Sequence, residues 1–251
     1  MTVRSVFGHP PGLAVLFATE SWERFSYFGN AALLVLYMVK HLFDPGRIES
    51  VLGFASVRTA LEFLFGRLEA QPLASQLFGI YTGLAYFMPI LGGLLADRLL
   101  GRRRTVIIGG LLMASGHFMM AFEPLLLLAL LLLILGIGAF KPNISVQVGA
   151  LYRADDPRRD RAYSIFYLGI NIGALFAPLV CGTLAAQYGW HYGFAAAGVG
   201  MLVSLGIYLL GQRTLPAEPS LQRERRHTRA AAAPLANSPS LRERPPDGRS
   251  Q

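Results

Sequence analysis

The chain has 251 residues, of which 53% are hydrophobic and 15% are charged, against about 25% charged in an ordinary soluble domain. The apolar residues come in long blocks, and a membrane-spanning helix needs about 20 of them because the hydrocarbon core is about 30 Å thick. Composition therefore excludes an ordinary soluble domain and predicts an integral membrane protein. The formal net charge of +8 does not indicate a nucleic-acid partner, because no aromatic and basic recognition motif accompanies the Arg residues.

The apolar blocks predict an all-α integral membrane chain whose bundle occupies residues 13–213, after an N-terminal segment of residues 1–12. Six spans are expected, at residues 13–40, 75–97, 104–123, 125–150, 162–187 and 190–211.

A half-apolar segment, residues 44–74, separates the first two predicted spans. Its charged residues alternate with Phe and Leu at helical spacing: Arg58, Glu62, Arg67 and Glu69. An amphipathic helix lying in the membrane interface is the preferred interpretation, and a partly ordered loop is the alternative.

The positions of Arg predict the orientation of the bundle. Four Arg residues follow the second predicted span within residues 97–104, and four follow the fourth within residues 153–161, whereas the connections after the third and fifth spans have neither Lys nor Arg. Positively charged loops stay in the cytoplasm. We therefore expect the N-terminus, both Arg-rich loops and the tail in the cytoplasm, the segment 44–74 in the periplasm, and the chain in the inner (cytoplasmic) membrane.

The tail, residues 214–251, is rich in Arg, Pro, Ala and Ser and has almost no aromatic residues. Such a stretch cannot bury enough apolar area to offset the entropy of ordering it. We predict a disordered tail that serves as a solvated linker, with binding to anionic lipid as the alternative.

Charged residues lie inside two predicted spans. Glu20, Glu23 and Arg24 are near the middle of the first, and Lys141 is well inside the fourth. A charge at mid-membrane costs at least about 2.5–3.5 kcal/mol on insertion scales, so such residues normally face a polar cavity and carry function. For Lys141 the alternative is a side chain that extends to the membrane interface.

The four charges sum to zero, which suits a narrow cavity that they share. Helical spacing places Glu20 beside both Glu23 and Arg24. If a substrate carboxylate pairs with Lys141, a released Glu loses its counter-charge and binds a proton. The pattern therefore gives a hypothesis of proton coupling.

The six spans also divide into two sets of three, and each set opens with a charged helix. Inverted three-helix repeats with a midplane site between them are a known transporter architecture.

Four motifs, together covering residues 13 to about 213, carry a family resemblance. The first, from Glu20 to Gly29, resembles the ExxERFxYY signature of the proton-dependent oligopeptide transporter family, and residues 92–103 are similar to the GxLaDrxGrr loop of the major facilitator superfamily. Residues 138–143 and 166–174 resemble the fourth-helix Lys-Pro motif and the fifth-helix signature of the same peptide transporters. The resemblance implies a six-helix bundle equivalent to the N-terminal half of such a transporter, and proton symport of di- and tripeptides.

The resemblance also implies roles for particular residues. Proton coupling and carboxylate binding are implied for Glu20, Glu23, Arg24 and Lys141. Binding of peptide is implied for Tyr27 and Asn171, with Tyr81 and Tyr86 as further candidates for which helix packing is the alternative. Gating is implied for the loop residues Asp97, Arg98, Arg102 and Arg103, with topological anchoring as the alternative. No metal or cofactor is implied.

Three departures from the family bear on function. Phe28 replaces the second Tyr of the first motif, and Ala31 stands where many members have Arg. The family has 12 or more helices, so the chain resembles a truncated half. Its partners would then be peptide, protons, the lipid bilayer and either a C-terminal bundle or a second copy of itself.

Other functions remain as alternatives. One is a truncated half-bundle without transport activity, and another is transport of a different carboxylated solute. An intramembrane enzyme finds little support, because the chain has no HExxH or GxSxG motif. His117 and His191 are isolated in sequence and are interpreted as packing or interface residues.

Overall fold

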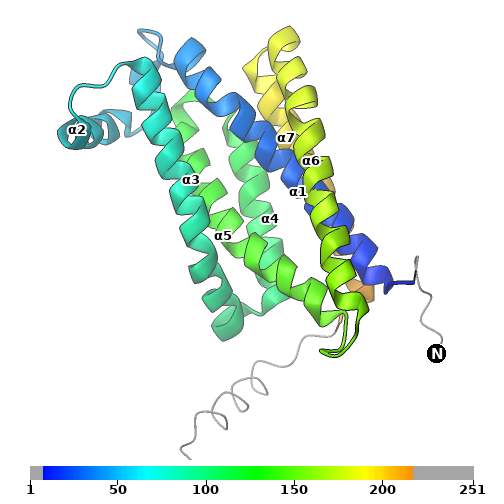
Figure 1. Cartoon of the computed structure of the whole chain (residues 1–251). Coiled ribbons are helices and arrows are strands. Elements are labelled where there is room, and N and C mark those ends of the chain that lie inside the picture. The colour runs from blue at the N-terminus through cyan, green and yellow to red at the C-terminus, as the bar shows by residue number, and fades with distance from the viewer. Residues whose placement is uncertain (1–7, 217–251) are drawn as a thin grey trace, which may run out of the picture. The chain divides into compact units, whose positions relative to one another are not determined.

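The computed structural model describes residues 8–216, and within them the repeating structure is helical (Figure 1). Seven α-helices follow one another: α1 Pro11–Tyr37, α2 Phe54–Phe65, α3 Ala70–Leu95, α4 Arg102–Met119, α5 Leu126–Ala150, α6 Arg158–Tyr188 and α7 Trp190–Gly211. Short helical turns extend or join them: η1 Met38–Leu42, η2 Ile48–Ser50, η3 Ala96–Leu100, η4 Glu123–Leu125 and η5 Gln212–Thr214. The expectations for residues 1–7 and 217–251, the larger part of the predicted tail, lie outside the described residues.

Each predicted span corresponds to one long helix, with ends that differ by a few residues. Within residues 8–216, four helical segments are long and apolar enough to cross a membrane: 70–100, 123–150, 158–188 and 190–214. Helix α1 has 27 residues but carries Glu20, Glu23 and Arg24, and α4 has 18 but begins with three Arg residues. The described part of the chain is therefore all-helical, with several helices able to cross a membrane, and a count of six spans stays a prediction.

Glycines with left-handed backbone conformations separate several of the helices. Gly101 has φ +81° between η3 and α4, and Gly189 has φ +108° between α6 and α7. Residues with a Cβ rarely adopt these angles. The two glycines allow the chain to reverse direction within a few residues, Gly101 at one end of the bundle and Gly189 at the other.

Helix packing follows a regular scheme. Helix α1 packs along α6 and α7, α5 packs along α3 and α4, and α4 also contacts α7. Exchanging the set α1, α3, α4 for the set α5, α6, α7 converts α1–α6 into α3–α5 and α1–α7 into α4–α5, and leaves α4–α7 unchanged; α6 also packs on α7, whereas α3 and α4 hardly touch. This correspondence is what two related three-helix repeats would produce.

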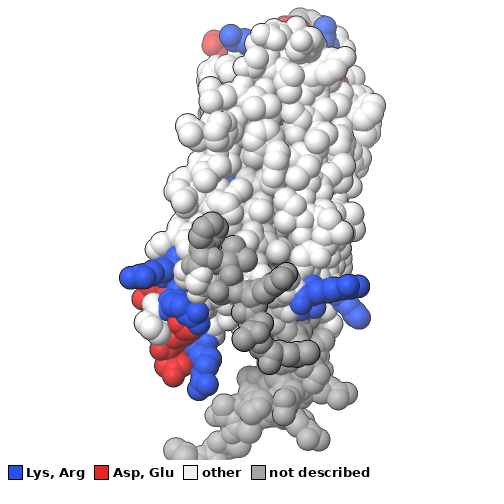
Figure 2. Space-filling view, turned by 90° about the vertical axis from the view of Figure 1, so that its right-hand side faces the viewer, with Lys and Arg blue, Asp and Glu red and all other residues white. Residues whose placement is uncertain are grey.

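Charged residues concentrate at the two ends of the bundle. On the face in Figure 2, Lys and Arg gather at the lower end, a few charges lie at the upper end, and a band of uncharged atoms separates them. The Arg-rich end contains the loop after α3 and the loop after α5. The other end, here called the far end, contains residues 38–53, 120–125 and 188–192.

Helix α2 lies at the far end, to the side of the bundle (Figure 1). Phe54 and Leu61 are buried, whereas Phe63 and Leu64 are 87% and 70% exposed. Arg58 donates to Glu62 over 3.0 Å one turn later. The segment 44–74 therefore contains a helix with both apolar and charged residues on its surface, and its place in the membrane interface stays a prediction.

Candidate functional site

The centre of α1 holds a buried cluster of three charged side chains. Glu20, Glu23 and Arg24 are 2%, 0% and 4% exposed. The Arg24 Nε lies 3.0 Å from Glu20 Oε1 and 2.5 Å from Glu23 Oε2. One guanidinium therefore contacts two carboxylates, which leaves the triad with a formal charge of −1.

Each member of the triad has a side-chain atom whose hydrogen-bonding capacity is unused. Among the described residues, Glu20 Oε2, Glu23 Oε1 and Arg24 Nη2 are buried without a hydrogen-bond partner. A buried charge that is only partly paired is costly. The free atoms are therefore suited to exchange partners with a proton, with water or with a charged substrate.

Lys141 supplies the fourth charge from α5. Its side chain is partly exposed, and its charge is close enough to interact with Glu20, Glu23 and Arg24. The Lys141 Nζ also lies 4.9 Å from the centre of the Tyr86 ring on α3. Cation–π contacts of this kind stabilise a desolvated cation. The structure thus brings together the four predicted coupling residues and Tyr86.

The remaining predicted binding residues occupy different surroundings. Tyr27 is 9% exposed, with its ring centre 5.2 Å from Arg24 Cζ, so it adjoins the cluster. Tyr81 is 2% exposed between helices, whereas Tyr86 is 65% exposed. Burial of Tyr81 fits the packing alternative, while Tyr86 has a free surface on which to meet a ligand.

Asn171 does not join the cluster. Its side chain is exposed on α6, and its amide donates to the Tyr167 carbonyl oxygen over 3.1 Å in the same helix. Within residues 8–216 no hydrogen bond connects it with the charges of α1. Its role in peptide binding stays a prediction.

The predicted gating residues lie at the Arg-rich end. Arg102 donates to the Asp97 carboxylate over 3.4 Å. Arg103 donates to the Leu215 and Pro216 carbonyl oxygens over 2.8 and 2.6 Å, which ties the start of α4 to the end of α7. Arg98 is exposed beside them. These contacts hold the loop to neighbouring segments, and both gating and topological anchoring stay predictions.

Several polar residues, some buried and some at the surface, were missed from the sequence. Asn30 is fully buried on α1, and among the described residues neither end of its amide has a hydrogen-bond partner. A second group at the far end joins His41, Arg47 and Glu123, with His41 Nε2 3.0 Å from Glu123 Oε1. Asn30 follows Glu23 by seven residues and so shares its helical face. This spacing could have identified it.

The histidines predicted to be packing or interface residues occupy two environments. His117 is 1% exposed in α4, and neither of its ring nitrogens has a hydrogen-bond partner within the described part of the chain. His191 is exposed at the far end, with its ring centre 6.3 Å from that of His41. The burial of His117 thus fits a packing residue, and the exposure of His191 fits a surface residue.

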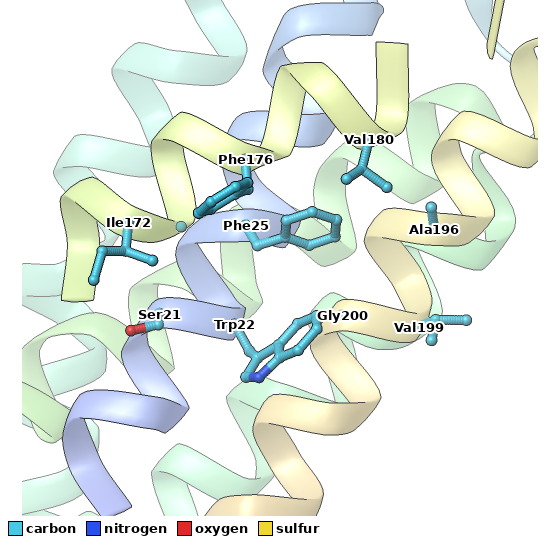
Figure 3. Close-up of a pocket in the computed structure, with 10 residues that line it drawn as sticks. Ser21, Trp22, Phe25, Ile172, Phe176, Val180, Ala196, Val199 and Gly200 are labelled. Atoms are coloured by element: carbon cyan, nitrogen blue, oxygen red, sulfur yellow. The ribbon is translucent and has the colours of Figure 1, made fainter. Parts of the chain in front are cut away.

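An apolar groove of about 680 Å³ lies between α1, α6 and α7 (Figure 3). Its lining includes Trp22 and Phe25 of α1, Phe176 of α6 and Val199 of α7, with Ser21 as the hydroxyl-bearing residue. None of the four coupling charges belongs to it. The groove is therefore separate from the charged site and suits contact with hydrocarbon.

Comparison with known proteins identifies the family. The model of the POT family matches residues 103–237. The chain is 42% identical over 214 residues to the di-/tripeptide transporter of Lactococcus lactis subsp. lactis (strain IL1403), covering 84% of this chain and 39% of that one. It is 42% identical over 210 residues to the peptide transporter YePEPT of Yersinia enterocolitica subsp. palearctica serotype O:3 (strain YE-P4), covering 82% and 37%.

A solved structure has the same arrangement of helices. The crystal structure of peptide transporter POT in complex with sulfate matches with a TM-score of 0.71 and 38% sequence identity, covering 92% of this chain and 46% of that chain. This chain thus spans about 39% of the length of the curated relatives. The family match, the identities and the shared fold together show that the chain belongs to the POT family.

Proposed function

We propose that this chain is the N-terminal six-helix bundle of a proton-coupled symporter of di- and tripeptides. The observation that carries the proposal is the buried set Glu20, Glu23, Arg24 and Lys141, which has no net charge and unused hydrogen-bonding atoms. The names of the relatives supply the substrate class.

The proposed coupling depends on exchange of partners within the cluster. A substrate carboxylate that pairs with Lys141 would withdraw that cation from the glutamates. The triad of α1 would then be left with its charge of −1, and a carboxylate beside an unneutralised carboxylate binds a proton more readily. Proton and substrate would therefore bind together.

The same proposal places the protein in the membrane. All six long helices would cross it, including α1 and α4, with the Arg-rich end in the cytoplasm and the far end in the periplasm of an inner-membrane protein. The α1 charges would be tolerated because they are paired and buried inside the bundle. Helix α2 would lie in the outer interface, with Phe63 and Leu64 in lipid.

Peptide binding would use the surface beside the cluster. Tyr27 and Tyr86 are next to Arg24 and Lys141, respectively, and Asn171 would contribute from α6 after a change in helix packing. A different carboxylated solute is the second candidate, because Arg24 and Lys141 can bind a carboxylate whatever the rest of the solute is. A C-terminal bundle, or a second copy of the chain, would close the cavity.

The first experiment is uptake of a labelled dipeptide into proteoliposomes that contain this chain alone, with and without an inward proton gradient. Gradient-driven uptake would support peptide symport by these six helices, and a Glu23→Gln variant should abolish it. Competition by a free carboxylic acid, without competition by dipeptides, would favour the second candidate. If folded and inserted protein shows no uptake, the chain alone is not a symporter, which supports the half-bundle without activity of its own.

A further inference from the structure

A stripe of polar residues continues from the charged cluster toward the far end of α1. The stripe consists of Glu20, Glu23, Tyr27, Asn30 and Tyr37 of α1 and of His41 in η1, the turn that continues α1. With Leu34 included, these positions are spaced alternately by three and four residues, so they share one helical face. We call these six residues the α1 polar stripe. It spans about 21 Å from Glu23 to Tyr37 at about 1.5 Å per residue.

Apart from His41 at its end, the stripe is buried rather than exposed to lipid or water. Glu23, Asn30 and Tyr37 are each 0% exposed, and Tyr27 is 9% exposed. Polar side chains on a membrane-spanning helix are costly to bury in apolar surroundings. A run of them at consecutive positions of one face requires a physical reason beyond packing.

Unpartnered atoms occur at intervals along the stripe. Among residues 8–216, Glu23 Oε1, both polar atoms of Asn30 and the Tyr37 hydroxyl have no hydrogen-bond partner. Tyr81 of α3 lies close enough to Asn30 to interact with its amide. Buried polar atoms nearly always bond to protein or to ordered water. Water molecules are therefore the expected partners of these atoms.

The far end of the stripe meets a set of titratable and charged groups. His41 Nε2 is 3.0 Å from Glu123 Oε1, and the ring centres of His41 and Tyr37 are 5.5 Å apart. Arg47 Nη1 lies 2.6 Å from His41 Nε2 and 3.1 Å from Glu123 Oε1. The His191 ring centre is 6.3 Å from that of His41. His41 is partly exposed. Its ring is therefore in reach of bulk water on this side of the bundle.

We propose that the α1 polar stripe is the route by which protons reach the glutamates from the far end. A proton taken up from bulk water at His41 and Glu123 moves along hydrogen-bonded water past the Tyr37 hydroxyl and the Asn30 amide. It ends on a carboxylate oxygen of Glu23 or Glu20, beside Arg24 and Lys141. Asn30 acts by positioning water, since an amide donates and accepts hydrogen bonds without titrating.

One residue interrupts the route. Leu34 is 0% exposed and lies between Asn30 and Tyr37 on the same face. A buried Leu excludes water from its surroundings, so the route is closed there in this conformation. Opening it requires α1 to move relative to its neighbours, which would keep protons from leaking when no substrate is bound.

The inference rests on the proposed proton coupling and adds a route to it. The test uses the full chain in proteoliposomes that have been sorted so that the far end faces the outer solution. The pH of that solution is lowered rapidly, and time-resolved infrared spectroscopy monitors the protonation of carboxylates. Loss of the signal in Glu20→Gln and Glu23→Gln variants assigns it. The amplitude of the infrared signal shows whether the glutamates bind protons. Its rate shows how fast protons reach them.

The expected result is a specific change in rate. Asn30→Leu and Tyr37→Phe should each slow protonation of the glutamates about tenfold and leave the signal amplitude unchanged. A tenfold change in rate corresponds to about 1.4 kcal/mol in the activation barrier for proton transfer. Leu34→Asn should accelerate it by supplying the missing polar position. Ser26→Ala is the control, because it removes a buried hydroxyl of α1 that bonds to the Trp22 carbonyl oxygen, off the stripe.

The possible failures are distinct. Absence of any carboxylate signal in the unmodified chain would overturn proton coupling, and the route with it. A normal signal whose rate does not respond to Asn30→Leu or Leu34→Asn would overturn the route while leaving the proposed coupling intact. Equal slowing by Ser26→Ala would also overturn the route, since any loss of buried polarity on α1 would then have the same effect.

Discussion

At the scale of single residues, the protein concentrates its unusual chemistry on α1. One Arg contacts two Glu side chains within one turn of helix, and all three are buried. Removing one partner of such a buried set costs about 3–5 kcal/mol, because the other charge is left uncompensated. A change in one charge of the cluster must therefore be answered by a change in another.

Lys141 gives the first prediction at this scale. In a protein that contains both bundles, Lys141→Ala should abolish proton-driven uptake, because the substrate carboxylate loses its cation and the glutamates lose their exchange partner. The measurement is uptake of labelled dipeptide with and without a proton gradient. Lys40→Ala removes an exposed Lys from η1 and should leave uptake unchanged. Full driven uptake by Lys141→Ala would remove this residue from the mechanism.

Asp156 gives a second prediction, in the loop before α6. Hydrogen bonds from the Arg158 side chain and backbone lower the pKa of Asp156 to about 2, from an ordinary value of 3.8. Arg158 also donates to the Gly8 carbonyl oxygen over 2.9 Å. Because the folded pKa is the lower one, the stabilisation is complete above pH 3.8 and is lost as the pH falls toward about 2.

Amide hydrogen exchange can follow this loss. After correction for intrinsic rates, exchange near Gly8 and at the start of α6 should increase between about pH 4 and pH 2. Asp156→Asn should show that faster exchange already at neutral pH. Asp155→Asn is the matched control, since Asp155 is 80% exposed on its side chain and contacts Arg153 instead. No difference between the two variants would contradict the role of Asp156.

At the scale of helices, close packing depends on glycine where α3 crosses α5. A Cβ added at Gly92 would overlap the Gly138 carbonyl oxygen, whereas Gly83 on the same helix has no atom near its Cβ position. Small residues let membrane helices approach closely. The crossing holds Tyr86 and Lys141 together, so this packing also positions the site.

The third prediction compares two identical substitutions. Gly92→Ala should destabilise the folded protein by about 1–3 kcal/mol through overpacking. Gly83→Ala should be neutral or slightly stabilising, because Ala favours a helix by up to about 1 kcal/mol. Thermal unfolding in detergent, followed by circular dichroism, measures both. Equal melting temperatures would show that the α3–α5 crossing is looser than the structure indicates.

Helix positions were predictable because long apolar runs have few alternatives in a membrane. The ends were less so: α3 begins at Ala70 and α6 at Arg158, several residues before the predicted spans. Helices continue into water, where charged residues are tolerated, so hydropathy alone underestimates their length. The helix within residues 44–74 was also expected, from charges at helical spacing.

The site was predictable where it depends on one helix. Spacing within α1 placed Glu20 next to Arg24, and the structure confirms that contact. Contacts between helices depend on how each helix is rotated about its axis, which tertiary packing decides. For that reason Asn171, predicted to face the peptide, is bonded to its own helix. The pairing of Lys141 with the Tyr86 ring likewise could not be read from either segment.

At the scale of the whole molecule, the charge distribution and the helix count must agree. The Arg-rich end and the far end can lie on opposite sides of a membrane only if the chain crosses it between them. Four helical segments within residues 8–216 are apolar enough to do so on composition. Whether α1 and α4 also cross determines which side each loop occupies, and hence whether the far end can receive protons from outside.

The last prediction tests this topology. In a Cys181→Ala background, which removes the buried native thiol, single cysteines replace Ser50, Phe122 and Ala154, all exposed. With six spans, a membrane-impermeant maleimide should label positions 50 and 122 in intact spheroplasts and position 154 only after lysis. If α4 did not cross, position 122 would lie on the same side as Arg102 and be labelled only after lysis. That result would place Glu123 in the cytoplasm, so the same labelling decides whether protons can enter the α1 polar stripe from the outer side.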